Sequence, residues 1–365
     1  MRARWNLLGI ALGTGLAALA PLAATAPRAV QDGTPAFHPE QELRLKKSFR
    51  EESRWTLESM SQRVNGSEVF QELPEFTGQV ERSAVVVDEY GPVRGGRPLQ
   101  LTRELEELAA SSTLELVAPG LEETYELRLA SALEGESVLF RWQEEEGEYA
   151  AELEDQDSAG GPDLAGLVED LDLRGLLPDG DAAEGDEWEV PAGEVETLFA
   201  LGGDFLRLPA AAPEGSYVAL DELQVLASGF VVPSEVAGDF SGEATAEWTA
   251  TREVDGRKLA VIEVAIDGTL SAELEDELLR AMTSLGLDDG RSDLEFSLAW
   301  SLEGEGELLW DLEAGHFRSF RLESEVEITG AIAWVEDLGG YELEFDGDFR
   351  LGGTAVVTAS SESAE

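Results

Sequence analysis

In the segment DLEFSLAWSLE, residues 293–303, apolar and polar side chains alternate along the whole length. Successive side chains of an extended strand point to opposite faces, so this spacing turns one face toward a core and the other toward water. The stretch therefore predicts a half-buried β-strand, whose apolar face is formed by Leu294, Phe296, Leu298, Trp300 and Leu302.

The same alternation continues on both sides of this strand, with short turn sequences between the runs. Glu303–Gly306 and Glu313–Gly315 are short enough to join antiparallel neighbours, and Asp255–Gly256 is a dipeptide preferred in tight hairpins. Asp346–Gly347 marks a further turn or a bulge. We expect a mainly β protein of the α+β class, in which long antiparallel meander hairpins form curved sheets or half-barrels.

A helical pattern interrupts this meander. Leu274, Leu278, Met282 and Leu285 recur at helical spacing, which places them on one face of a helix. Ser271 can cap the start, and Gly286 can end the last turn. The pattern predicts one packed helix near residues 271–286.

Two β-rich domains are expected, an N-terminal one over residues 41–155 and a C-terminal antiparallel one over residues 236–359. The connecting region between them, residues 156–235, is richer in glycine and proline. In it Pro162 and Pro191 precede short apolar patterns, as first-turn prolines of brief helices do. No aligned internal repeat relates the two halves, so their origin by duplication stays open.

The ends of the chain predict segments outside the fold. Arg2 and Arg4 precede an apolar stretch and a run of small residues, which is the layout of a secretory signal over residues 1–26. Pro27 disfavours cleavage at that point, so an uncleaved N-terminal anchor is the alternative. Residues 27–40 are expected to be a linker, and residues 360–365 a disordered tail. We expect an exported protein, periplasmic or extracellular.

The composition restricts the partners. The formal net charge is −52, from 77 acidic and 25 basic residues, and a surface of this sign repels nucleic acid and anionic membranes. The sequence has no cysteine, so disulfides, thiol catalysis and iron–sulfur clusters are excluded. No later stretch is apolar and long enough to cross a membrane as a helix. A hydrophobic small molecule or an envelope component remains as a partner.

Histidine is too scarce for most catalytic sites. The two histidines, His38 and His316, form no cluster with zinc-ligand spacing and no pattern typical of a serine hydrolase. We therefore expect no enzyme and assign no catalytic residue. A hydrolase that uses two carboxylates is the remaining catalytic alternative, because acidic residues are abundant. Exposed carboxylates keep near-normal pKa values, which makes them unsuited to acid catalysis.

Calcium is the one metal that the acidic loops suggest. Asp179, Asp181, Glu184 and Asp186 supply the oxygen ligands that calcium prefers, although their spacing departs from the twelve-residue calcium loop. A solvated acidic loop is the competing interpretation. No cofactor is otherwise expected.

Four tryptophans fall on the apolar side of the expected strands. Trp248, Trp300, Trp310 and Trp334 fill a core in the simpler interpretation, which is the usual place of such residues. If the sheet curves into a half-barrel that its helix covers only in part, the same side chains line a cavity for an apolar ligand.

Three short segments carry a resemblance. The sequence GDEWEVP at residues 185–191 follows Leu177–Pro178, and FSGEA at residues 240–244 is followed by GRKLAVI at residues 256–262. Together they resemble segments of uncharacterised exported bacterial β-rich proteins, which are domains of unknown function. The resemblance implies export and a β-rich fold but no activity. Taken together, these patterns predict a non-catalytic envelope or extracellular protein that binds an apolar ligand or acts as a scaffold. A calcium-binding structural protein is the alternative.

Overall fold

The computed structural model of the chain describes residues 33–68, 75–118, 121–154, 164, 166–200, 239–273, 291–337 and 342–364. The expected fold class is confirmed: these residues form a large antiparallel meander sheet that is curved and not closed, together with one α-helix. The signal or anchor expected over residues 1–26 lies outside the described residues. The brief helix expected after Pro162 is not formed by the described residues that follow: residues 164 and 166–173 are irregular or in turns, and a 3-10 helix begins only at Arg174. Within them, no helix has the length and apolar composition needed to cross a bilayer.

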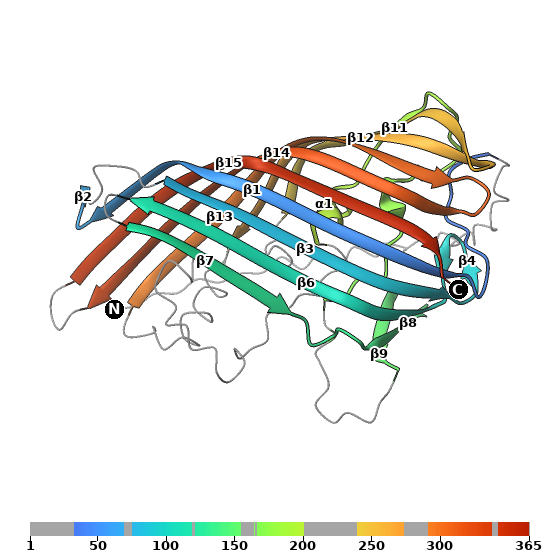
Figure 1. Cartoon of the computed structure of the whole chain (residues 1–365), viewed down its shortest axis with the longest axis horizontal. Helices are drawn as coiled ribbons and strands as arrows, with labels where there is room; N and C mark the ends of the chain where they lie inside the picture. The colour runs from blue at the N-terminus through green and yellow to red at the C-terminus, as the bar shows by residue number, and fades with distance from the viewer. Residues whose placement is uncertain are drawn as a thin grey trace, which may run out of the picture.

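Eight long strands make up most of the sheet (Figure 1). They are β1 (Arg44–Val64), β3 (Glu75–Tyr90), β6 (Gln100–Ala118), β11 (Asp239–Val254), β12 (Arg257–Glu273), β13 (Arg291–Asp311), β14 (His316–Asp337) and β15 (Glu342–Ser363). The shorter elements are β2 (Ser67–Glu68), β4 (Val93–Arg94), β5 (Arg97–Pro98), β7 (Leu121–Ala130), β8 (Ser137–Gln143), β9 (Glu148–Leu153), β10 (Glu187–Glu189), the 3-10 helix η1 (Arg174–Leu176) and α1 (Ala192–Ala200).

The two β-rich stretches share a single sheet. Its order is β10-β11-β12-β13-β14-β15-β1-β3-β6-β8-β9, with β7 beside β6 and β2 beside β1. The junction between the stretches is the antiparallel pair of β1 and β15, in which Leu45 lies opposite Ser363 and Val64 opposite Phe345. Residues 360–363, expected in a disordered tail, are therefore strand residues paired with β1.

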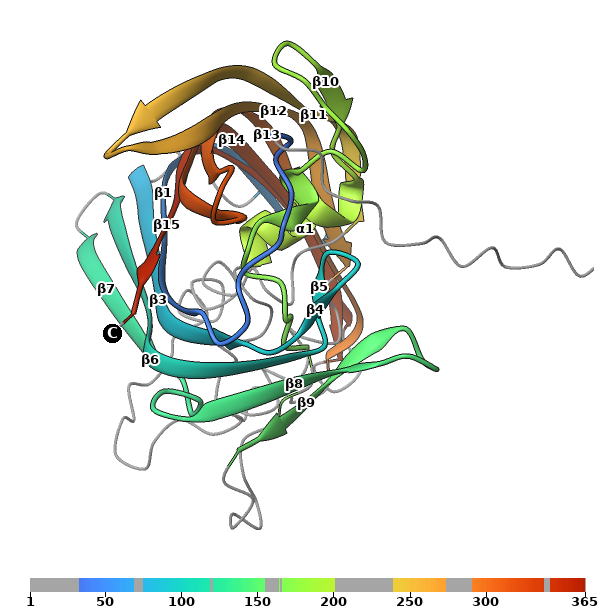
Figure 2. The same cartoon turned by 90° about the vertical axis from the view of Figure 1, so that its right-hand side faces the viewer.

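The concave face of the sheet holds the core, and a second layer covers part of it (Figure 2). This layer consists of α1 and of residues 166–186, which we call the strap. The N-terminal segment also packs here, since Phe37 is 6% exposed and the indole N–H of Trp310 donates to the Ala36 carbonyl at 3.2 Å. From residue 33 onward the expected linker thus lies against the sheet.

Two of the four predicted turns are confirmed, and the other two are wrong. Asp255 and Gly256, both with positive φ, join β11 to β12, and residues 313–315 lie in the turn between β13 and β14. The turn predicted at Glu303–Gly306 is wrong, because β13 runs through it. Likewise Asp346 and Gly347 lie inside β15 without a break in register.

The glycines at 304 and 306 have a packing role in β13. They fall in the same phase as the inward-facing Leu302 and Leu308, so the alternation is uninterrupted. A Cβ at Gly304 would overlap the hydroxyl oxygen of Ser324 on the adjacent strand. Glycine is therefore used here for close approach, although in sequence its repetition resembles turn chemistry.

The helix predictions are confirmed at one place and wrong at another. The Pro191 carbonyl accepts hydrogen bonds from the N–H groups of Glu194 and Val195 and begins α1, as expected for a first-turn proline. Ser271 does not cap a helix, since it is a residue of β12 opposite both Asp239 and Ala299. The remainder of that expected helix, 274–286, lies outside the described residues.

The edge of the sheet at β11 is protected although β10 is only three residues long. Beyond β10, the carboxylate of Glu196 on α1 accepts the backbone N–H of Phe240 at 2.8 Å. At the other end the indole N–H of Trp248 donates to the Ala250 carbonyl at 2.9 Å. These side chains occupy backbone groups that would otherwise be open to another strand.

Candidate functional site

The four tryptophans that the sequence singled out lie on the concave face but in two environments. Trp248 and Trp310 are buried in the core, with 6% and 0% exposure. Trp300 and Trp334 are half-buried, and Trp334 stacks on Phe345 with ring centroids 3.7 Å apart. None of the four lines the small cavity between α1, residues 170–176 and the sheet.

The four calcium candidates do not converge on a common point. In the part of the chain that the structure describes, no three His, Asp or Glu side chains are arranged to hold a metal ion. One candidate has a structural role instead: the carboxylate of Asp186 accepts the backbone N–H of Ala183 at 2.8 Å and so fixes a turn. Asp179, Asp181 and Glu184 are the others.

His316 is buried and serves the packing between β13, β14 and β15. It lies opposite Asp311, and its Nδ1 is 3.2 Å from the hydroxyl of Ser361 and 2.8 Å from the Phe317 carbonyl. Burial lowers the pKa of His316 against the opposing effect of that carbonyl. The expected linker histidine, His38, donates its backbone N–H to the Gly315 carbonyl at 3.1 Å.

The most unusual chemistry of the concave face is a buried ion cluster. Asp88 on β3 lies directly opposite Arg103 on β6, and the guanidinium binds the carboxylate in a bidentate manner at 2.6 and 2.9 Å. Lys47 on β1 is diagonal to Asp88 and approaches it to 2.7 Å. All three side chains are 0% exposed. Such close charge-assisted pairing is what makes buried charges tolerable.

The strap adds a second carboxylate to this cluster. Asp172 is 0% exposed, and one of its oxygens lies 2.7 Å from the Lys47 ammonium and accepts the phenol O–H of Tyr90 at 2.6 Å. The Lys47 ammonium also lies 5.3 Å from the centroid of the Tyr90 ring. Lys47 therefore connects the strap to the sheet through ion pairs with both.

Arg103 holds the strap through its backbone as well. Its two terminal nitrogens donate to the carbonyls of Val168 and Glu169 at 2.9 and 2.7 Å. The side chain of Glu169 in turn pairs with Arg174 of η1, which also approaches Asp170 to 2.9 Å and lies over the Phe37 ring. The ion cluster is defined here as Lys47, Asp88, Arg103, Glu169, Asp170, Asp172 and Arg174.

Burial and pairing shift the proton affinities in this region in different directions. Burial alone would raise the pKa of Asp88, but the charges of Arg103 and Lys47 outweigh it and hold that pKa below its ordinary value. For Glu169 burial wins over the charge of Arg174, and its pKa rises to about 7. Burial, reinforced by the charge of Asp172, raises the pKa of Tyr90 well above its ordinary value.

A second buried pair anchors α1 to the sheet. Glu51 on β1 lies directly opposite Arg82 on β3, and the two side chains form an ion pair. Arg82 also donates to the Phe199 carbonyl in the last turn of α1 at 3.2 Å, where a positive charge is favourable. Burial raises the pKa of Glu51 despite the charge of Arg82.

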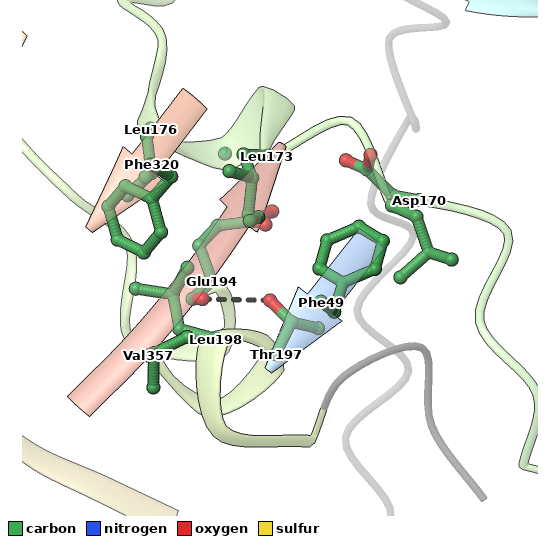
Figure 3. A pocket seen from close by; sticks show the side chains of 12 residues that line it. Phe49, Asp170, Leu173, Leu176, Glu194, Thr197, Leu198, Phe320 and Val357 are labelled. Carbon is green, nitrogen blue, oxygen red and sulfur yellow. Dashed lines mark hydrogen bonds between the residues drawn. The ribbon is translucent and has the colours of Figure 1, made fainter. Parts of the chain in front are cut away.

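One small cavity lies beside the cluster, between the strap, α1 and the sheet (Figure 3). Its volume is about 30 Å³. Phe49, Phe320 and Val357 form its floor on the sheet, and Leu173 and Leu198 belong to its cover. A cavity of this size can hold water and is far below the several hundred Å³ of a typical ligand pocket.

The ion cluster is not among the sites predicted from the sequence, although the sequence carries a signal for it. Lys47, Asp88 and Arg103 are isolated in the chain, but each stands at an inward position of an alternating strand. The pattern is visible in Leu45-Lys47-Phe49, Val86-Asp88-Tyr90 and Leu101-Arg103-Leu105. A charged residue in the phase of the core residues indicates a buried pair.

Comparisons with known proteins found only distant likenesses. No family model matches the chain, and neither does any curated protein. Among solved structures it is similar to the outer membrane protein OprG from Pseudomonas aeruginosa, at 7% identity and a TM-score of 0.23 over 89% of this chain and 98% of that one. It is also similar to OccK7 (OpdD) from Pseudomonas aeruginosa, at 7% identity and a TM-score of 0.16 over 88% of this chain and 100% of that one. Likenesses at this level carry no argument about function.

Proposed function

We propose that this chain is an exported, non-catalytic protein of the envelope or the extracellular space, and that its curved sheet serves as a rigid scaffold. The observation that carries the proposal is the tight packing of the covered part of the concave face. The ion cluster holds the strap on the sheet, and the buried pair of Glu51 and Arg82 holds α1 there. The cavity left between these segments and the sheet has a volume of about 30 Å³. A drug-sized or lipid-sized ligand does not fit in that volume.

The buried acidic side chains that the structure describes are all in ion pairs, which favours a non-catalytic role. Asp88 is held by Arg103 and Lys47, Glu51 by Arg82, and Glu169 by Arg174. All of these carboxylates are buried under the strap or α1, with 6% exposure or less. A pair of acids for glycoside hydrolysis needs room for a sugar between them, and this region offers none.

The convex face offers an acidic surface to partners. In register, Glu303 lies opposite both Asp267 and Glu325, and Glu305 lies opposite Glu323, with all five side chains exposed. Like charges directly opposite one another destabilise a sheet, so nearby cations stabilise this face. We infer a diffuse layer of cations on it, calcium included, and a cationic envelope component as the class of partner.

A binding titration separates the scaffold from a ligand carrier. The purified protein without residues 1–32 is mixed with an uncharged fluorescent lipid probe, and tryptophan quenching and probe emission are followed. The scaffold proposal expects no saturable binding. Saturable binding at micromolar probe overturns it.

An apolar ligand is the second candidate function, because Trp300 and Trp334 are only half-buried on the concave face. If this candidate is right, Trp300→Ala and Trp334→Ala each weaken probe binding. Trp142→Ala is the matched control, since Trp142 is half-buried on the short strand β8, where it lies beneath Arg97.

A calcium titration decides the remaining alternative. A structural calcium site at Asp179, Asp181, Glu184 and Asp186 would raise the melting temperature steeply and saturably with calcium. A diffuse layer would instead give a gradual rise that equal ionic strength of magnesium reproduces. The variant Asp181→Asn distinguishes the two, because only a defined site loses its calcium response.

A further inference from the structure

The charges of the ion cluster do not balance. Lys47, Arg103 and Arg174 supply three positive charges, whereas Asp88, Asp170, Asp172 and Glu169 supply four negative ones when all are ionised. Because five of these seven side chains are buried and the other two, Asp170 and Arg174, are partly buried, the excess negative charge is poorly screened by solvent. The cluster is neutral only after it takes up one proton.

Two carboxylate oxygens mark where the excess charge lies. Asp172 Oδ2 and Glu169 Oε1 are buried, and neither accepts a hydrogen bond from any residue that the structure describes. An unpaired buried carboxylate oxygen is costly, and protonation of the carboxyl group removes most of that cost. Both oxygens belong to the strap, and none of the cluster's sheet residues has such an oxygen.

The backbone of the strap is strained at the same place. Leu173, between Asp172 and Arg174, has φ 57° and ψ 33°, the left-handed conformation that side chains with a Cβ rarely adopt. The contacts on either side hold it there: Asp172 to Lys47 and Arg174 to Glu169. Opening of the strap would relieve this strain.

We propose that the strap is a proton-controlled closure of the concave face, tight when Glu169 is protonated and loosened when Glu169 is ionised. Opening would expose the apolar floor of the cavity, formed by Phe49, Phe320 and Val357. This inference goes beyond the scaffold proposal, since it concerns the attachment of the strap and leaves the sheet itself unchanged.

The groups that face Glu169 come from three elements and from the strap. Arg174 of η1 favours the ionised form, whereas Asp170 and Asp172 of the strap oppose it. Tyr149 of β9 interacts electrostatically with Glu169, and Arg103 of β6 donates a hydrogen bond to the backbone carbonyl of Glu169. Burial outweighs the attraction of Arg174, and the resulting pKa of about 7 places the transition in the neutral range.

Hydrogen exchange of the full chain tests this proposal. Exchange of strap peptides within residues 166–178 is compared at pH 5.5 and pH 8, corrected for the intrinsic rate and referred to a peptide of β13. The opening constant of the strap should rise on the order of tenfold or more between these pH values while β13 stays unchanged.

Two variants separate a proton switch from a general loosening. Glu169→Gln keeps a neutral group at this position and should leave the strap equally protected at both pH values. Glu305→Gln removes a carboxylate from the exposed convex face and should behave like the unmodified chain. Retention of the full pH response by Glu169→Gln overturns the proposal. Should that variant fail to fold, the unmodified chain decides alone, since a strap whose exchange is the same at both pH values overturns the proposal as well.

Discussion

Asp88 and Arg103 lie directly opposite one another on β3 and β6 and form a bidentate ion pair with no exposed surface. The same two side chains also contact other parts of the molecule. Asp88 binds the Lys47 ammonium, and Arg103 donates hydrogen bonds to two backbone carbonyls of the strap. The cluster built on this pair determines how the second layer attaches to the sheet.

Truncation of Asp88 should destabilise the protein severely. Asp88→Ala leaves the charges of Lys47 and Arg103 buried without their shared partner, and breaking a buried pair in this way costs about 3–5 kcal/mol. Urea unfolding followed by tryptophan fluorescence measures the loss. The control is Glu307→Ala, which breaks the exposed pair with Arg252 and should cost at most ~1 kcal/mol. Equal losses in the two variants would contradict the role assigned to the cluster.

The stability of the protein should depend on pH through Glu169. Its folded-state pKa is raised to about 7 from an ordinary value of 4.5, so its contribution is fully present below 4.5 and is lost as pH rises to about 7. Glu169→Gln should therefore match the unmodified chain near pH 4.5 and exceed it at pH 8, by an amount on the order of 3 kcal/mol. Unfolding free energies across this range are the measurement. A variant that is less stable at pH 8 would count against the raised pKa.

Two glycine substitutions should have opposite effects. Gly304→Ala places a Cβ against Ser324 and the backbone of β14, so we expect a loss of about 1–3 kcal/mol. Gly193→Ala, in the first turn of α1, meets no atom within 4 Å and should gain about 0.5 kcal/mol from the lower entropy of the unfolded chain. Thermal melts of both variants check this. A neutral Gly304→Ala would show that β13 and β14 are not in close contact there.

Removal of the Glu196 carboxylate should open the edge of β11. Glu196→Ala leaves the N–H of Phe240 without its acceptor, at a cost of about 1–2 kcal/mol. The amide of Phe240 should then exchange faster, and the protein should associate at high concentration through the exposed strand. Glu253→Ala, an exposed site further along β11, is the control and should change neither property.

The sequence predicts strands of this protein well because their alternation is a local property. Residues 293–303 are in β13, and the Asp255–Gly256 turn is where the dipeptide places it. The same local reasoning fails at Gly304, whose meaning depends on Ser324 on another strand. It fails again at Ser271, where pairing with β11 and β13 overrides a capping pattern.

The ion cluster illustrates a different limit. The inward phase of Lys47, Asp88 and Arg103 can be read from the chain, but which charges meet depends on strand order. The strap adds Asp172 from a segment with no periodicity of its own. The tertiary fold determines which buried charged side chains pair with one another, and the alternation of residues along a strand does not reveal these pairs.

The pairing of β1 with β15 has a consequence for how this protein folds. These strands are the first and last long strands of the sheet in sequence, yet they lie side by side at its centre, with Leu45 opposite Ser363. Contacts this remote along the chain form slowly, since the loop entropy must be lost before the contact is gained. Until β15 has been synthesised and delivered, β1 lacks its neighbour on one side. The edge of β1 that β15 covers is open to other chains until then, so aggregation is a hazard for the unfinished chain.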